Sequence, residues 1–134
     1  MAYEIRFAGD LMIVRFLGII TREDLRASLA EVEGIEASRD AAPDRITDLS
    51  ESDADEISFD AIEELVERRR AARLKNRVKS AIFAPGDVQF GFSRMFQSMN
   101  DNPQIEVAVF REPVRMASWL GIGALNPRAE DLRS

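Results

Sequence analysis

Apolar residues recur along the chain with two spacings, and segments of one spacing alternate with segments of the other. Runs in which every second residue is apolar, or short runs that are apolar throughout, are typical of strands, whereas apolar residues three and four positions apart are typical of helices. Because only Gly9-Asp10 separates the first two such runs, they are predicted to form a hairpin. The strands predicted on this basis are Tyr3–Ala8, Leu11–Leu17, Arg45–Leu49, Val78–Phe83 and Ile105–Phe110.

Four segments between and after these strands have the helical spacing. The first follows Thr21, a residue type that often caps a helix, and 34–43 is predicted to be a loop or a frayed helix end. The second follows Ser58, which can cap it in the same way. Asp87 is predicted to cap the third helix, and the fourth is short and ends before Gly121.

Strands that alternate with helices predict an α/β fold with a mixed five-stranded sheet. The hairpin would form one antiparallel edge, followed by parallel β-α units and about four helices. Right-handed connections place successive helices on one face of the sheet if each strand is added beside the last. The fourth and fifth strands are apolar on both faces, so an additional helix, the C-terminal tail or a second subunit must cover the other face. On this ground we expect a homo-oligomer, in the simplest case a homodimer.

The length of 134 residues predicts one domain, which we place at 1–125, followed by a polar tail at 126–134. No segment approaches the roughly 20 apolar residues that span a bilayer. The N-terminal residues MAYEIRF contain charges where a signal peptide needs an apolar run, so we expect a cytoplasmic protein. The net charge of −6 makes nucleic acid an unfavourable partner, because phosphates attract basic surfaces.

The chain contains neither cysteine nor histidine. This composition excludes disulfides, thiol nucleophiles and thiolate metal sites, and it removes the commonest general base at neutral pH. The sequence also lacks a Gly-x-Ser-x-Gly motif and a phosphate-binding loop with lysine. We therefore expect a protein that is not an enzyme and that uses no cofactor and no metal.

Eight acidic residues lie between Glu51 and Glu67. Clustered carboxylates can bind magnesium or calcium, so a metal-dependent hydrolase that uses Asp48, Asp53 and Asp55 is one alternative. The glycine and glutamate of a calcium-binding loop are not at the required spacing, however. A solvated loop followed by an acidic first helical turn explains the pattern better.

Basic residues are concentrated directly after this acidic segment, in the second half of the second helix. Cations complement the dipole at a helix C-terminus, and the pairs Glu64–Arg68 and Glu67–Arg70 could form along the helix. The helix dipole and these two pairs do not explain three successive arginines, so an anionic group is a candidate ligand. The residues predicted to bind it are Arg68, Arg69, Arg70 and Arg73.

The third helical segment is the richest in aromatic and methionine side chains. Phe92 and Phe96 share one helical face with two methionines, which predicts core packing, whereas Phe90 lies off that face and could line a pocket mouth or a subunit interface. Combined with the arginines, these residues suggest an alternative function. A pocket beside the second and third helices, lined by Phe90, Phe92 and Phe96, would bind a lipid, an acyl chain or another small anionic ligand.

Three stretches of sequence carry a family resemblance. They are RITDLSES followed by ISFDAIEEL, then VKSAIFAPGDVQFGFSRMF, and then IEVAVFREPVRMASWL. In this order they resemble the SpoIIAA-like branch of the STAS domain family, whose founding members are bacterial anti-sigma factor antagonists, and in particular its divergent, uncharacterised members. The resemblance implies a STAS-like fold and a non-enzymatic regulatory or ligand-binding domain. It would act through protein–protein interaction, with an anti-sigma-type regulator as one possible partner.

The resemblance also locates a regulatory position. The founding members carry a phosphorylated serine at the start of the second helix. If Ile62 and Leu65 occupy the family's apolar helix positions, Asp60 stands at the phosphoserine position and Ser58 is the nearest hydroxyl. We therefore expect no phosphoserine switch. The carboxylate of Asp60 would stabilise the helix start through the helix dipole, and a permanent mimic of the phosphorylated state is the alternative.

Overall fold

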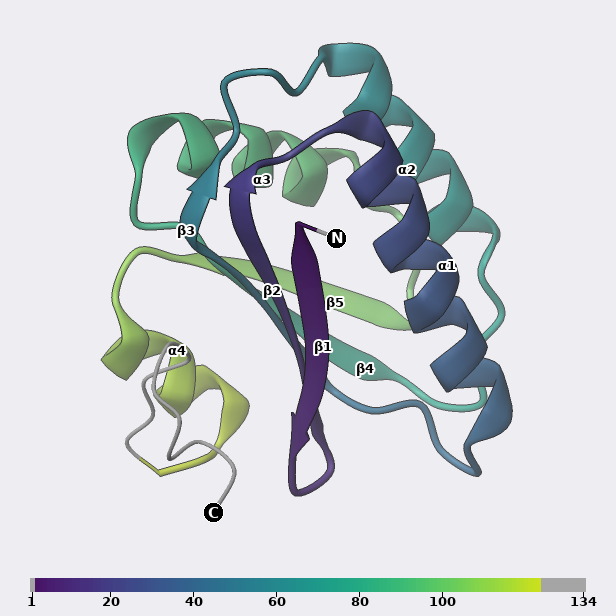
Figure 1. Cartoon of the computed structure of the whole chain (residues 1–134). Helices are drawn as coiled ribbons and strands as arrows, with labels where there is room; N and C mark the ends of the chain where they lie inside the picture. The colour runs from purple at the N-terminus through teal and green to yellow at the C-terminus, as the bar shows by residue number, and fades with distance from the viewer. Residues whose placement is uncertain (1, 124–134) are drawn as a thin grey trace.

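The computed structural model describes residues 2–123, and its five strands form one mixed sheet (Figure 1). The first two strands pair antiparallel and all other neighbours pair parallel, which confirms the predicted α/β class. Each strand lies beside the one that precedes it in the chain. In sheet order, the strands are β1 (Tyr3–Ala8), β2 (Leu11–Ile19), β3 (Arg45–Asp53), β4 (Val78–Phe83) and β5 (Ile105–Phe110).

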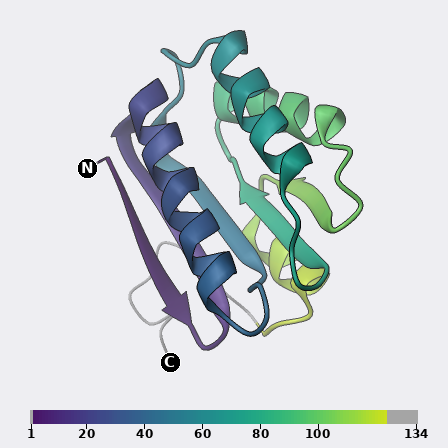
Figure 2. The same cartoon turned by 90° about the vertical axis from the view of Figure 1, so that its right-hand side faces the viewer.

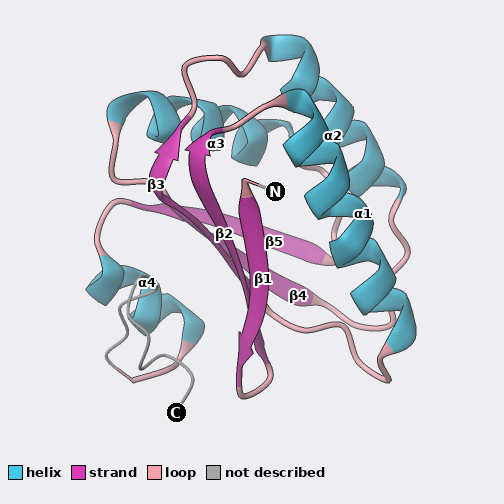
Figure 3. Ribbon diagram, viewed as in Figure 1, coloured by secondary structure: helices cyan, strands magenta, loops and turns pink. Residues whose placement is uncertain are grey.

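The helices form two layers on opposite faces of the sheet (Figure 3). Because the parallel strands are added in one direction, right-handed connections put α1 (Arg22–Ser38), α2 (Phe59–Ala71) and α3 (Asp87–Met99) on the same face. The helix α4 (Pro113–Leu120) lies on the other face, and Figure 2 shows α1 and α2 side by side in front of the sheet with α4 behind it. No described helix combines the length and the apolar character needed to cross a membrane.

Local capping interactions fix where the helices begin. Thr21 and Asp24 form a reciprocal box in which each backbone N–H donates to the other residue's side chain, at 3.0 and 3.1 Å. The hydroxyl of Ser58 accepts from the N–H of Ala61 at 3.2 Å, as predicted. The expected cap at Asp87 is wrong, because α3 is preceded by Gly86 as its N-cap residue.

Three predicted boundaries are also wrong, one of them being the end of β2, which lies at Ile19 and not at Leu17. The segment after residue 34 continues as helix to Ser38, because Glu36 on that last turn is buried against α2. The strand β3 does not end at Leu49 but continues to Asp53, because the longer β2 supplies pairing partners as far as Ile19. These extensions depend on contacts with a neighbouring element, which the local sequence pattern does not contain.

The second face of the sheet is covered by α4. Met116 is fully buried there against Ile13, Ile46 and Phe83, so an additional helix accounts for strands that are apolar on both faces. Trp119 packs against the same cluster. The homo-oligomer stays a prediction, and the tail 126–134, with its boundary at residue 125, lies outside the described residues.

The packing of α4 can be tested by truncating Met116. The Met116→Ala variant should lower the free energy of unfolding by about 2–5 kcal/mol, because it leaves a cavity under the helix. Val114→Ala on the same helix is the control, since that side chain is 75% exposed and its loss should cost less than about 0.5 kcal/mol. Urea denaturation of the two variants measures both values, and equal losses would contradict burial of α4.

Candidate functional site

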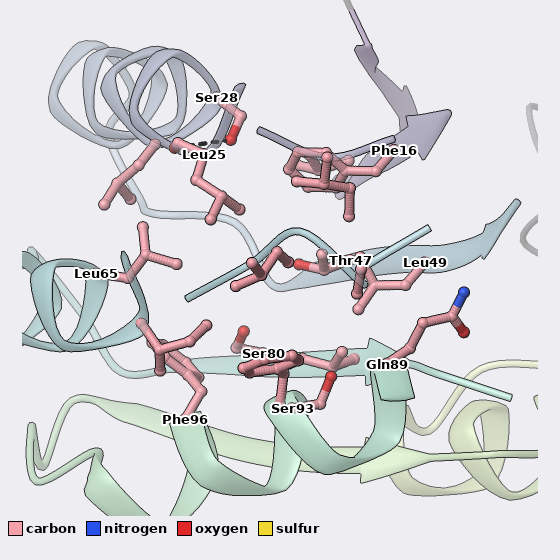
Figure 4. A pocket seen from close by; sticks show the side chains of 18 of the residues that line it. Phe16, Leu25, Ser28, Thr47, Leu49, Leu65, Ser80, Gln89, Ser93 and Phe96 are labelled. Carbon is pink, nitrogen blue, oxygen red and sulfur yellow. Dashed lines mark hydrogen bonds between the residues drawn. The ribbon is translucent and has the colours of Figure 1, made fainter. Parts of the chain in front are cut away.

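A cavity of about 130 Å³ lies between the α1–α3 layer and the sheet. In Figure 4 the side chains of Leu25 from α1, Leu65 from α2 and Phe96 from α3 point into the same space, which Phe16 and Leu49 border from the strands. Because alternate residues of a strand face opposite sides, one face of β2, β3 and β4 supplies the floor of the cavity. The lining is therefore mainly aliphatic and aromatic.

Polar side chains enter this lining from β3 and β4. Arg45 stands at the start of β3, beside Ser80 of β4, and its Nη2 donates to the Ser80 hydroxyl at 3.3 Å. The Nε of Arg45 is buried and has no hydrogen-bond partner. Arg45 also has no carboxylate partner among residues 2–123. A guanidinium thus faces an apolar cavity with one neutral partner.

A second arginine on the cavity wall has a partner of its own. Arg69 of α2 forms a two-pronged ion pair with Glu36 of α1, with Nη1–Oε1 and Nη2–Oε2 distances of 3.1 and 2.8 Å. Both side chains are almost completely buried. The pair of Arg69 and Glu36 is neutral. Together with Arg45, the three side chains therefore carry one net positive charge.

Burial and the nearby charge act on Arg45 together. The loss of hydration lowers the pKa of Arg45 to about 10, and repulsion from Arg69 contributes in the same direction, while attraction to Glu36 opposes them. The side chain therefore remains a cation at neutral pH. Arg45 is half-buried with its Nε fully enclosed, and a cation withdrawn from water without a counter-ion raises the free energy of the folded protein.

The helix α3 presents small and polar side chains to the cavity. Gln89 and Ser93, four residues apart, are its buried residues and both line the cavity. The amide of Gln89 connects two elements, because its Oε1 accepts from the N–H of Gly86 at 3.0 Å and its Nε2 donates to the carbonyl of Ser52 at 2.6 Å. A serine rather than a large apolar residue at position 93 leaves the cavity space open.

Comparison with solved structures identifies the architecture. An uncharacterised protein of the DUF3478 family from Shewanella loihica PV-4, described as having a SpoIIAA-like fold, superimposes with a TM-score of 0.56. The match covers 89% of this chain and 92% of that one, at 18% sequence identity. The chain has a SpoIIAA-like fold. The sequence matches no protein-family model and none of the curated proteins with which it was compared.

The SpoIIAA-like fold separates the three phenylalanines that the sequence grouped together. Phe92 and Phe96 line the cavity, beside α2 and the sheet. Phe90 lies elsewhere on α3, and the guanidinium groups of Arg111 and Arg94 stand 4.9 and 5.7 Å from the centre of its ring. These two arginines place Phe90 in a cation–π contact rather than in the cavity lining.

Arginines at the end of α2 pair with acidic residues of the same chain. Arg68 pairs with Glu33 of α1, and Arg70 pairs with Glu67 and Asp101. The expected pair Glu64–Arg68 is wrong, because Glu64 binds Arg26 of α1 through two hydrogen bonds, the shorter of 2.6 Å.

Arg73 and Arg69 complete this cluster. Arg73 donates to backbone carbonyls at the end of the helix. Of the four predicted ligand-binding arginines, Arg69 is the one that lines the cavity.

The position that the family resemblance assigns to the phosphoserine switch lies at the exposed start of α2. The hydroxyl of Ser58 is engaged as the helix cap, and Asp60 stands in the first turn with its side chain exposed. Neither residue lines the cavity. The missing phosphoserine switch stays a prediction.

The three aspartates of the metal alternative lie outside the cavity as well. Asp48 is fully buried on the α4 side of the sheet, where its Oδ1 accepts from the N–H and hydroxyl of Ser50 and its Oδ2 stands 3.5 Å from Nε of Arg15. Asp53 accepts from the N–H of Asp55 at 2.8 Å, in an exposed turn. Within residues 2–123, no group of three acidic side chains is placed to hold a metal ion.

Sequence reasoning missed six polar residues of the cavity: Ser28, Arg45, Thr47, Ser80, Gln89 and Ser93. They stand among apolar residues on inward-facing stripes, and this interruption is the sequence pattern that could have revealed them. Arg45 precedes Thr47 and Leu49 at the two-residue spacing of one strand face, for example. A polar residue in such a stripe is a stronger indication of a site than charged residues on an exposed face.

The buried ion pair in the cavity wall can be tested by removing its members separately and together. Arg69→Met and Glu36→Leu should each lower the free energy of unfolding by about 3–5 kcal/mol, because each leaves one buried charge without its partner. The double variant should recover most of this loss, since it removes both charges.

Chemical denaturation of the four proteins measures the coupling between positions 36 and 69. Arg115→Met, which removes the exposed Arg115–Glu112 pair, is the control and should cost less than about 1 kcal/mol. Additive losses in the double variant would contradict a direct interaction between Glu36 and Arg69.

Proposed function

We propose that this SpoIIAA-like domain binds a small, mainly apolar molecule in the cavity between its three-helix layer and its sheet. The observation that carries the proposal is the cavity itself, which lies within the core layer and has a mainly apolar lining. Protein interiors are close-packed, and voids larger than a water molecule are few. A cavity of about 150 Å³ with an apolar lining is known to accept benzene, and the cavity here, at about 130 Å³, is of comparable size.

The volume also limits the size of the ligand. At about 130 Å³ the cavity fits a single ring or a short acyl chain. Of the ligands that the sequence suggested, a cavity of this volume supports a short acyl group rather than a membrane lipid with long chains. The proposal therefore narrows the lipid or acyl alternative to small molecules.

Binding, rather than catalysis, fits the residues of the wall. The described residues that line the cavity include two arginines, three serines and one glutamine, but no acid. Glu36 stands behind the cavity wall, and both of its carboxylate oxygens accept hydrogen bonds from Arg69. General acid–base catalysis needs a proton donor or acceptor at the reacting atoms, and arginine remains protonated at neutral pH.

The regulatory role implied by the family resemblance stays a prediction, as do a protein partner and a homo-oligomer. The proposed ligand is compatible with such a role, because α2 carries both the cavity residue Leu65 and the exposed Asp60. A ligand between α2 and the sheet would act on the same helix that carries the family's regulatory position.

The proposal can be tested by filling the cavity. The neutral compound 1-hexanol is the probe, and its binding to the wild-type protein is measured by isothermal titration calorimetry and by changes in amide NMR shifts. Ser93→Leu should weaken this binding at least about tenfold, because the larger side chain occupies the space that the probe needs. Amide shifts in wild type should concentrate on α2, α3 and β3.

Ser98→Leu is the matched control, since Ser98 lies on the same helix but is exposed. This variant should bind 1-hexanol as the wild type does, and thermal melts confirm that both variants are folded. Equal affinity in Ser93→Leu and wild type, or shifts confined to the outer surface, would contradict binding in the cavity.

A further inference from the structure

The guanidinium of Arg45 is a charged group that the packing of the described residues does not neutralise. Arg45 lines the cavity, its Nη2 has the Ser80 hydroxyl as a partner at 3.3 Å, and its Nε is buried without a hydrogen bond. Buried arginines are normally paired with carboxylates, because an unpaired buried charge is unfavourable. The donor on Nε is thus available to a group that enters the cavity.

The surrounding charges do not satisfy Arg45. The neighbouring acid, Glu36, is engaged by both terminal nitrogens of Arg69, at 3.1 and 2.8 Å. The group thus contains two guanidinium cations and one carboxylate, so it carries one net positive charge. A ligand with a single negative charge would neutralise the group, whereas a doubly charged phosphate would reverse its sign.

The position of Arg45 on its strand gives the site a direction. Arg45, Thr47 and Leu49 line the cavity from the same face of β3. At about 3.3 Å per residue, Arg45 and Leu49 are about 13 Å apart along the strand. The cationic end of the lining lies at Arg45 and Ser80, and the apolar lining continues towards Leu49 and Phe16.

We propose that Arg45 is the anion-binding residue of the cavity and that its ligand is a small monocarboxylate with an apolar tail. The carboxylate accepts hydrogen bonds from the Arg45 guanidinium and from the Ser80 hydroxyl, and the tail lies along Thr47 and Leu49. Planar carboxylates match the geometry of a guanidinium, and such charge-assisted bonds are stronger when water is excluded. This inference rests on the proposed function and names the chemical class of its ligand.

The inference differs from the anion site that the sequence suggested at the end of α2. There Arg68 and Arg70 already pair with acids of the protein, so an added anion would have to displace Glu33 or Asp101. At Arg45 no acid of residues 2–123 has to be displaced. The burial of the site also favours an anion that carries its own apolar group over a fully hydrated ion.

The experiment compares hexanoate with hexanamide, which has the same chain but no charge, by isothermal titration calorimetry. Wild-type protein should bind hexanoate about tenfold or more tightly than hexanamide, because of the charge-assisted bonds to Arg45. Arg45→Met should lose this preference and bind the two compounds within about twofold. The melting temperature of Arg45→Met should equal or exceed that of wild type, because the variant removes an unpaired buried charge.

Arg73→Met is the control, because Arg73 is exposed and lies outside the cavity. It should keep the full preference for hexanoate, and loss of that preference in Arg73→Met would overturn the assignment to Arg45. Arg45→Lys keeps the positive charge and should keep part of the preference, so it separates a loss of charge from a loss of structure.

The outcomes separate this inference from the proposed function. If hexanamide and 1-hexanol bind as tightly as hexanoate does, the cavity is a ligand site but the role of Arg45 is overturned. If the preference survives in Arg45→Met, the anion is bound elsewhere and the inference is overturned as well. If none of the three compounds binds the wild-type protein, the proposed function fails together with the inference.

Discussion

The buried ion pair between Arg69 and Glu36 fixes the position of α2 against α1. Its two hydrogen bonds join the last turns of two helices whose residues are 33 positions apart in the chain. The carbonyl of Arg69 also accepts from the buried amide of Asn102 at 2.7 Å, so the segment before β5 is tied to the same point. With this pair in place, Arg69 is neutralised and Arg45 remains as the excess charge of the interior.

The cavity lies between the sheet and the helices that cover one of its faces. The helices α1, α2 and α3 share that face of the five strands. Here α3 carries Gln89 and Ser93 at its buried positions, so the space above β3 and β4 stays partly open. On the opposite face, α4 places the fully buried Met116 against Ile46. The ligand site proposed above lies on the face that α1, α2 and α3 cover.

The predictions that succeeded were those that depend on short-range sequence. The alternation of apolar residues located all five strands, and the capping residues Thr21 and Ser58 located two helix starts correctly. The candidate site was predicted only in part. Phe92 and Phe96 line the cavity, but Arg45 was not considered, because a charged residue at a strand end is normally solvated. Arg68 and Arg70 were predicted to bind an anion because arginines are concentrated at that end of α2. In the structure, acids distant in the sequence pair with them.

The sequence by itself determined the order and type of the elements and the hairpin, because these depend on residues only a few positions apart. Right-handed connections predicted helices on one face only if each strand is added beside the last, and the tertiary structure shows that order. The tertiary structure alone decided which charges are neutralised. The carboxylates of Glu64, Glu33 and Glu36 lie 33 to 38 residues from Arg26, Arg68 and Arg69, which they bind. The neighbour of Arg45 on the next strand is a serine rather than an acid. Whether a buried charge is paired depends on which helix and strand faces meet, and those contacts exist only in the folded chain.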